Sequence, residues 1–159
     1  MSLIELETKI YAPIERCFKL SLSPNLHVIS AGKTKEKIIK GWTEGVFELG
    51  DEVTWRGKHF GVSQDMTVKI TELKFPEYFS DEMIKGNFKS MRHEHYFSNE
   101  NGNTIMKDIF RFESPFGIFG KSFNKIFLKN YMRNFLVERN KIIKEYAESD
   151  KWKEIIKLE

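Results

Sequence analysis

The chain has 159 residues, and its 26 lysines and arginines nearly balance its 23 aspartates and glutamates, leaving a net charge of +3. Because this charge is small and no block of like charge occurs, a nucleic-acid partner is not expected. No apolar stretch approaches the roughly 18 to 20 residues of a membrane helix, and the first residues lack the pattern of a signal peptide. The single cysteine fits a reducing compartment. We therefore expect one cytoplasmic domain over residues 1–159, without integral membrane association.

The first elements are predicted to be a strand and two short helices. Residues 3–10 alternate apolar and polar side chains, which is typical of a strand with one buried face. Pro13 fits the first turn of a helix, and Cys17 and Phe18 follow on its apolar face. Pro24 then ends this helix and begins a second, shorter one.

The middle of the chain is predicted to be a sheet, followed by one long helix. Six strands are expected, at residues 35–42, 50–60, 63–73, 77–86, 88–97 and 104–114. Short turns between successive strands, such as the Asn- and Gly-rich segment 99–103, indicate an antiparallel meander. From about residue 121 to residue 149 the apolar spacing becomes helical.

A long amphipathic helix that follows a curved antiparallel sheet can bury its apolar stripe on the concave face of that sheet. The expected fold class is therefore α+β, in the arrangement called the helix-grip fold. A curved antiparallel sheet of six to seven strands would wrap around the long C-terminal helix, with two short helices after the first strand. This arrangement leaves room for a cavity between sheet and helix.

Four polar residues are predicted to lie together on the inner face of the sheet. His93 and His95 alternate with charged residues and share their face with apolar ones, so both should point inward. The same alternation turns Asp81 and Asp108 inward in the two neighbouring strands. Because an unpaired buried charge is costly, the two carboxylates and the two imidazoles should pair with one another.

The pattern alone leaves several roles open for this group. It can be a hydrogen-bonded network that stiffens the sheet, a polar patch that orients a ligand, or an acid–base pair formed by His95 and Asp108. A bound metal is not expected, because a third ligand and an open coordination position are not evident from the spacing.

A larger set of residues resembles a known superfamily. These residues are Phe79, Asp81, Gly86, Phe88, His93, His95, Phe97, Thr104, Met106, Asp108 and the stretch Pro115, Phe116 and Gly117. They resemble the START-like, or SRPBCC, superfamily of polyketide cyclases, dehydrases and lipid-binding proteins, and within it a bacterial branch of ligand-binding proteins. The resemblance spans residues 3–148 and implies a helix-grip fold with a deep cavity. Asn87 and Met91 depart from it, since the branch has proline and tryptophan there.

Binding or transport of a small hydrophobic or aromatic molecule is the function that we expect, without a cofactor and in a monomer or weak homodimer. Asp81, His93, His95 and Asp108 would hold the polar end of the ligand. The expected wall consists of Phe79, Met83, Met91, Met106, Phe110, Phe123, Phe127, Tyr131 and Phe135. The alternative is a polyketide cyclase- or dehydratase-like enzyme, in which His95 acts with Asp108 on the bound molecule.

Four other residues have individual predictions. Cys17 is expected to be a small buried side chain, and His27 is expected at the surface. His59 is expected at the mouth of the cavity. Arg139 can either reach an internal carboxylate or extend to water, and the second is favoured.

Overall fold

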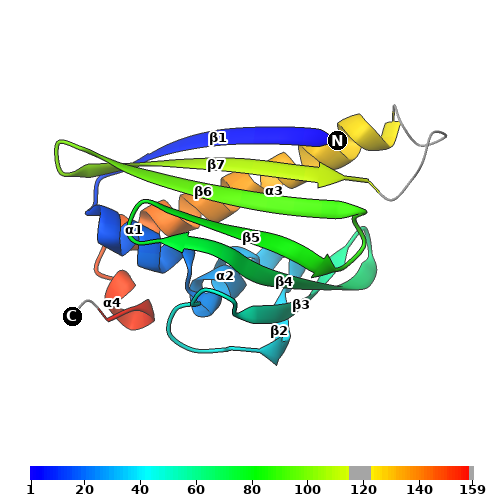
Figure 1. Ribbon diagram of the computed structural model, residues 1–159, viewed down its shortest axis with the longest axis horizontal. Helices are drawn as coiled ribbons and strands as arrows, with labels where there is room; N and C mark the ends of the chain where they lie inside the picture. Colours follow the sequence, from blue (N-terminus) through cyan, green and yellow to red (C-terminus); the bar gives the residue numbers. More distant parts are fainter. Residues whose placement is uncertain (115–122, 158–159) are drawn as a thin grey trace.

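The computed structural model describes residues 1–114 and 123–157, and it is built around a seven-stranded antiparallel sheet (Figure 1). The strands follow the order β1-β7-β6-β5-β4-β3-β2. Their bounds are β1 (Ser2–Ile10), β2 (Lys37–Gly41), β3 (Glu52–His59), β4 (Val62–Lys74), β5 (Tyr78–Lys85), β6 (Ser90–Glu100) and β7 (Asn103–Glu113). The predicted meander is confirmed, because β2 to β7 each pair with the next strand of the sequence.

The first strand joins the sheet at the far end from its sequence neighbours. β1 pairs with β7 in an antiparallel register that runs from Ser2 opposite Phe112 to Ile10 opposite Thr104. The last strand of the sheet therefore lies beside the first. This pairing leaves β1 and β2 as the two edges of the sheet.

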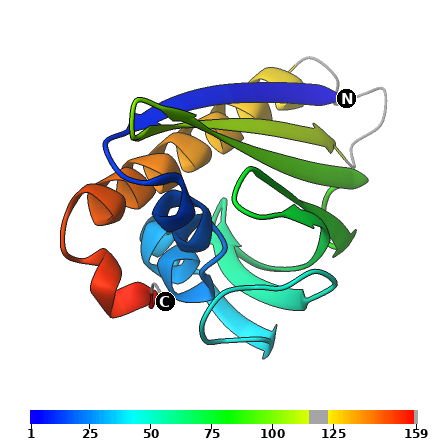
Figure 2. The same cartoon turned by 60° about the vertical axis from the view of Figure 1, so that its left-hand side comes forward.

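The helices lie on one side of the sheet, and the longest crosses it diagonally (Figures 1 and 2). They are α1 (Ile14–Ser21), α2 (Pro24–Ser30), the 3₁₀ helix η1 (Gly32–Thr34), α3 (Phe123–Glu148) and α4 (Trp152–Ile155). Ser23 caps α2 by accepting a hydrogen bond from the backbone N–H of Leu26 at 3.3 Å. The predicted helix-grip arrangement is confirmed, while the predicted break at residues 115–120 lies outside the described residues.

The core between α1 and the sheet is aromatic. The ring of Phe18 lies 5.4 Å from that of Phe79 and 5.3 Å from that of Phe97, with the edge-on geometry that aromatic pairs prefer. Cys17, next to Phe18 on the same helix, is fully buried, and burial raises the pKa of its thiol. The prediction of a small buried cysteine is confirmed.

Gly41 is the last residue of β2, where the chain approaches the backbone of β3 closely. Replacing it tests whether this close approach requires a glycine. Its φ is +104°, and a Cβ atom there would collide with the carbonyl oxygen of Glu52. Gly41→Ala is expected to lower the free energy of unfolding, measured in urea, by about 2 kcal/mol more than the control. The control is Gly45→Ala, because Gly45 also has a positive φ, of +71°, but has open space around it. Equal losses in the two variants would contradict this account.

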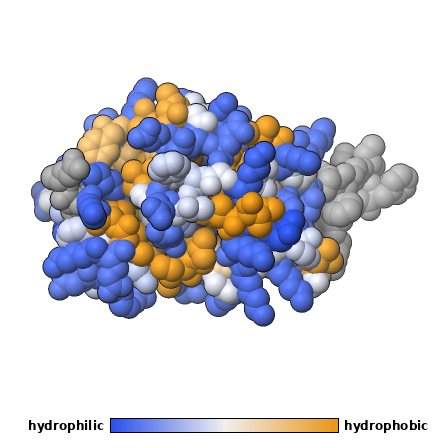
Figure 3. Space-filling model, turned by 90° about the horizontal axis from the view of Figure 1, so that it is seen from below, coloured by the Kyte–Doolittle hydropathy of each residue, from blue (hydrophilic) through white to orange (hydrophobic). Residues whose placement is uncertain are grey.

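The surface is hydrophilic for the most part, with hydrophobic patches between the charged side chains on the face seen from below (Figure 3). Among the helices of the described residues, none combines the length and the apolar character that crossing a membrane requires.

Candidate functional site

A cavity of about 570 Å³ lies between β3, β4 and the first half of α3. Its apolar lining consists mainly of aromatic and methionine side chains, namely Trp55, Phe60, Met66, Phe88, Leu128, Met132 and Phe135. Its polar lining includes His27, Glu36, His59 and Tyr131. An aromatic wall with a few polar groups is the usual composition of a small-molecule site.

The four polar residues form one continuous chain of contacts in the cavity wall. The phenol oxygen of Tyr131 is 2.8 Å from Nδ1 of His59, and Nε2 of His59 is 3.4 Å from Oε1 of Glu36. The other carboxylate oxygen of Glu36 is 2.8 Å from Nε2 of His27. Thr34 also donates to Glu36, at 3.3 Å. The carboxylate thus orients both imidazoles, and His59 in turn orients the hydroxyl of Tyr131.

The buried carboxylate of Glu36 stays ionised because of these partners. Burial opposes ionisation and raises the pKa of Glu36, but the hydrogen bonds from His27 and His59 outweigh it and lower the pKa to about 2. At neutral pH this part of the wall therefore holds a fixed negative charge beside two imidazoles.

A second polar cluster lies deeper, under the middle of α3, and is centred on Asp108. Oδ1 of Asp108 lies 2.9 Å from Nε2 of His93 and 3.0 Å from Nδ1 of His95. Asn140 donates to Oδ2 at 2.6 Å, and a guanidinium nitrogen of Arg139 lies 3.6 Å from Oδ1. The prediction that Arg139 extends to water is wrong. Its side chain points from α3 toward the carboxylate of Asp108.

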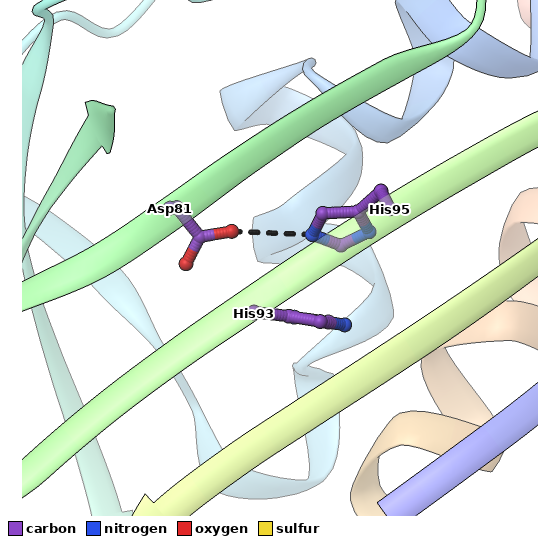
Figure 4. Close-up of side chains that lie close together, drawn as sticks. All are labelled: Asp81, His93 and His95. Atoms are coloured by element: carbon purple, nitrogen blue, oxygen red, sulfur yellow. Dashed lines mark hydrogen bonds and ion pairs between the residues drawn. The ribbon is translucent and has the colours of Figure 1, made fainter. Parts of the chain in front are cut away.

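Asp81 completes the cluster from the neighbouring strand (Figure 4). It lies opposite His93 in the register of β5 and β6, and its Oδ1 is 3.1 Å from Nε2 of His95. The two imidazole rings are 3.7 Å apart, and the ring of His95 stacks on Phe79 at 4.1 Å. His95 therefore has a carboxylate at each ring nitrogen and an aromatic ring on one face.

The charge states of this cluster follow from burial and pairing. Burial raises the pKa of Asp108, but the hydrogen bond from His93 and the close approach of His95 outweigh it and hold the pKa well below its usual value. The pKa of Asp81 is also lowered, since burial is outweighed by the hydrogen bond from His95 together with the nearby charges. Burial and the neighbouring His95 lower the pKa of His93 to about 4, despite the opposing effect of Asp108. His93 is therefore neutral at pH 7.

The structure brings together the four polar residues of the sequence prediction, but outside the lining of the 570 Å³ cavity. Of the predicted wall, Tyr131 and Phe135 line this cavity. Phe79, Met91, Met106 and Phe110 are buried in the core, Met83 is half-buried and Phe127 is exposed. The side chain of Phe123 lies outside the described residues. The roles of the remaining residues in ligand contact, and of His95 and Asp108 in acid–base chemistry, stay predictions.

Sequence reasoning missed the polar chain in the cavity wall. Glu36 lies in the turn before β2, and His27 lies on α2, so no shared periodicity connects them. His27, expected at the surface, is half-buried and lines the cavity, where its ring stacks on Trp55 at 4.0 Å and bonds to Glu36. Of the four residues in this chain, sequence analysis associated only His59 with the cavity, at its mouth. His59 does line the cavity.

A larger depression, of about 1270 Å³, lies on the outer face of the sheet. Charged side chains make up nearly half of its lining, and one of them, Arg92, pairs with Glu72 in the lining and with Glu82 beside it. Such a surface favours water over an apolar molecule, so the smaller cavity is the better candidate for a ligand site.

Comparison with known proteins supports the fold. No protein-family model and no curated protein sequence matches the chain. Among solved structures, a protein from Thermus thermophilus is similar with a TM-score of 0.70 and 14% identity, over 89% of this chain and 97% of that chain. A START superfamily protein from Mycobacterium smegmatis has a TM-score of 0.70 and 11% identity, over 92% of this chain and 97% of that chain.

A plant protein shows the same likeness. The major latex-like protein of Panax ginseng has a TM-score of 0.65 and 13% identity, over 92% of this chain and 97% of that chain. These identities are too low to transfer an activity, but the similarity spans nearly the whole of each chain. Together with the seven-stranded sheet and the long C-terminal helix, it shows that this protein has the START-like, helix-grip fold.

Proposed function

We propose that the protein binds a small hydrophobic or aromatic molecule in the cavity between β3, β4 and α3. The observation that carries this proposal is the cavity itself. Its volume of about 570 Å³ falls within the range of roughly 300 to 1,000 Å³ that is typical of small-molecule sites. Its lining combines aromatic rings from β3 and α3 with flexible methionines, which adapt to ligands of different shape.

The polar chain supports one orientation of the ligand. Glu36 fixes His59, and His59 fixes the hydroxyl of Tyr131 on the cavity wall. A polar group of the ligand would lie at this hydroxyl, while its apolar part would contact Met132 and Phe135. Preorganised polar groups of this kind cost little entropy on binding.

The test is titration calorimetry with 2-methoxynaphthalene, on protein that has first been checked by native mass spectrometry for a molecule retained from its host. The wild type is expected to bind one equivalent, since aromatic rings line the cavity. Met132→Trp, which fills the cavity with a larger ring, is expected to bind at least about tenfold more weakly, a loss of about 1.4 kcal/mol.

The matched control is Leu3→Trp, which adds the same ring at an exposed position of β1 far from the cavity lining. It should bind like the wild type. A wild type that retains no molecule and does not bind the probe, or equal weakening in both variants, would contradict the proposal.

A further inference from the structure

We infer that Asp81, His93 and His95 form a binding site for a divalent transition metal ion, for which Zn²⁺ is the best fit. Asp81 and His93 are cross-strand partners, and His95 follows on the same face of β6. One ligand atom from each residue lies within 4.8 Å of the other two. Figure 4 shows Asp81 and His95 pointing toward each other, with the ring of His93 beside them. The sheet therefore brings together two ring nitrogens and one carboxylate oxygen without any contribution from loops.

His95 lies between two carboxylates. Its Nε2 is 3.1 Å from Asp81, and its Nδ1 is 3.0 Å from Asp108. An imidazole that carries one N–H can donate to only one of them. In the described structure Nδ1 is buried without an aligned hydrogen bond, which is uncommon for a buried polar atom. A cation at Nε2 removes this conflict, because it binds Asp81 and places the ring proton on Nδ1, facing Asp108.

Asp108 has the position of the outer carboxylate that usually accompanies metal-binding histidines. Such histidines donate their second ring N–H to a carboxylate, which fixes the tautomer and the ring orientation. Both rings direct one nitrogen to Asp108, Nε2 from His93 and Nδ1 from His95. This leaves Nδ1 of His93 and Nε2 of His95 for the metal.

The charges around the cluster are consistent with a bound cation. Among the described residues, the two carboxylates of Asp81 and Asp108 face one guanidinium, that of Arg139, which lies 3.6 Å from Asp108. Asn140 holds the second oxygen of Asp108 at 2.6 Å, so α3 fixes this carboxylate in place. The negative charge of Asp81 is therefore the one left for an ion to balance.

The ligand set and its access favour zinc with an open coordination position. Two imidazoles and one carboxylate are ligands that Zn²⁺ accepts, and three protein ligands leave a fourth position for water or another molecule. The side chain of Asp81 is 18% exposed, whereas that of His95 is 1% exposed. Asp81 is thus the most exposed of the three ligands, so we expect the open coordination position on its side.

The test is titration of metal-free protein with Zn²⁺ in the presence of a competing chelator. One Zn²⁺ per chain is expected, and Asp81→Asn, which keeps the shape but removes the charged ligand, should weaken binding by at least about 100-fold. The matched control is Glu36→Gln, which alters the other buried cluster of histidine and carboxylate. Its Zn²⁺ affinity should equal that of the wild type.

A second measurement needs no variant, in case Asp81→Asn does not fold. Long-range ¹H–¹⁵N NMR of the wild type should show the ring nitrogens of His93 and His95 shifting on addition of Zn²⁺, while those of His27 and His59 stay unchanged. Absence of stoichiometric binding, unchanged affinity in Asp81→Asn, or shifts confined to His27 and His59 would overturn the inference.

Discussion

Replacing Asp108 by asparagine is expected to lower the free energy of unfolding by about 3 to 5 kcal/mol, as measured by urea denaturation at pH 7. The carboxylate is fully buried and contacts His93, His95, Arg139 and Asn140. An asparagine amide removes the charge that balances the buried guanidinium of Arg139. Its N–H groups would also face donors that now point at carboxylate oxygens.

The control for this experiment is Glu113→Gln, which removes a carboxylate paired with Lys89 at 2.9 Å on the surface. No measurable change is expected there, because exposed ion pairs contribute little to stability. If the two variants lose similar amounts of stability, the cluster around Asp108 does not stabilise the fold as its geometry indicates.

Acidification is expected to destabilise the protein well before its carboxylates are protonated. The pKa of His93 falls from 6.5 in an exposed chain to about 4 in the folded protein. Between these values the unfolded state binds more protons, so stability rises with pH and is lost as the pH falls from about 6.5 to about 4. The loss attributable to His93 is about 1.4 kcal/mol per pH unit within this window, and roughly 3 kcal/mol in total.

Urea denaturation of the wild type and of His93→Gln at a series of pH values measures this effect. The variant should show a flatter dependence between pH 6.5 and pH 4.5. Below that range both proteins should lose stability, because the lowered pKa values of Glu36, Asp81 and Asp108 contribute stability that disappears as these groups are protonated. Identical slopes above pH 4.5 would mean that His93 is not the group responsible.

The inner cluster was predictable from the sequence because it depends on local geometry. Side chains alternate along a strand, so His93, His95 and Asp108 were assigned to one face by counting residues. The short turns between successive strands then predicted that the strands containing these residues lie next to one another. By contrast, the position of Arg139 depends on how far α3 lies from the sheet, which helical periodicity does not specify.

The polar chain in the cavity wall was not predictable, because each member comes from a different part of the fold. His27 lies on α2, Glu36 precedes β2, His59 ends β3 and Tyr131 lies on α3. Their contacts depend on the paths of the connections between these elements. The same limit applies to the pairing of β1 with β7, since alternation shows which face of a strand is buried but not which strand lies beside it.

The pairing of β1 with β7 has a consequence for the order in which the sheet can be completed. Ser2 meets Phe112, so this ladder joins the two most distant strands of the sequence, whereas each of the other ladders joins strands that follow one another. The entropy lost on closing a loop grows with its length, and long-range contacts slow folding. During synthesis β1 has no partner strand until residues 103–113 have been made. Until then β1 cannot take its place in the sheet, and its apolar face cannot be buried there.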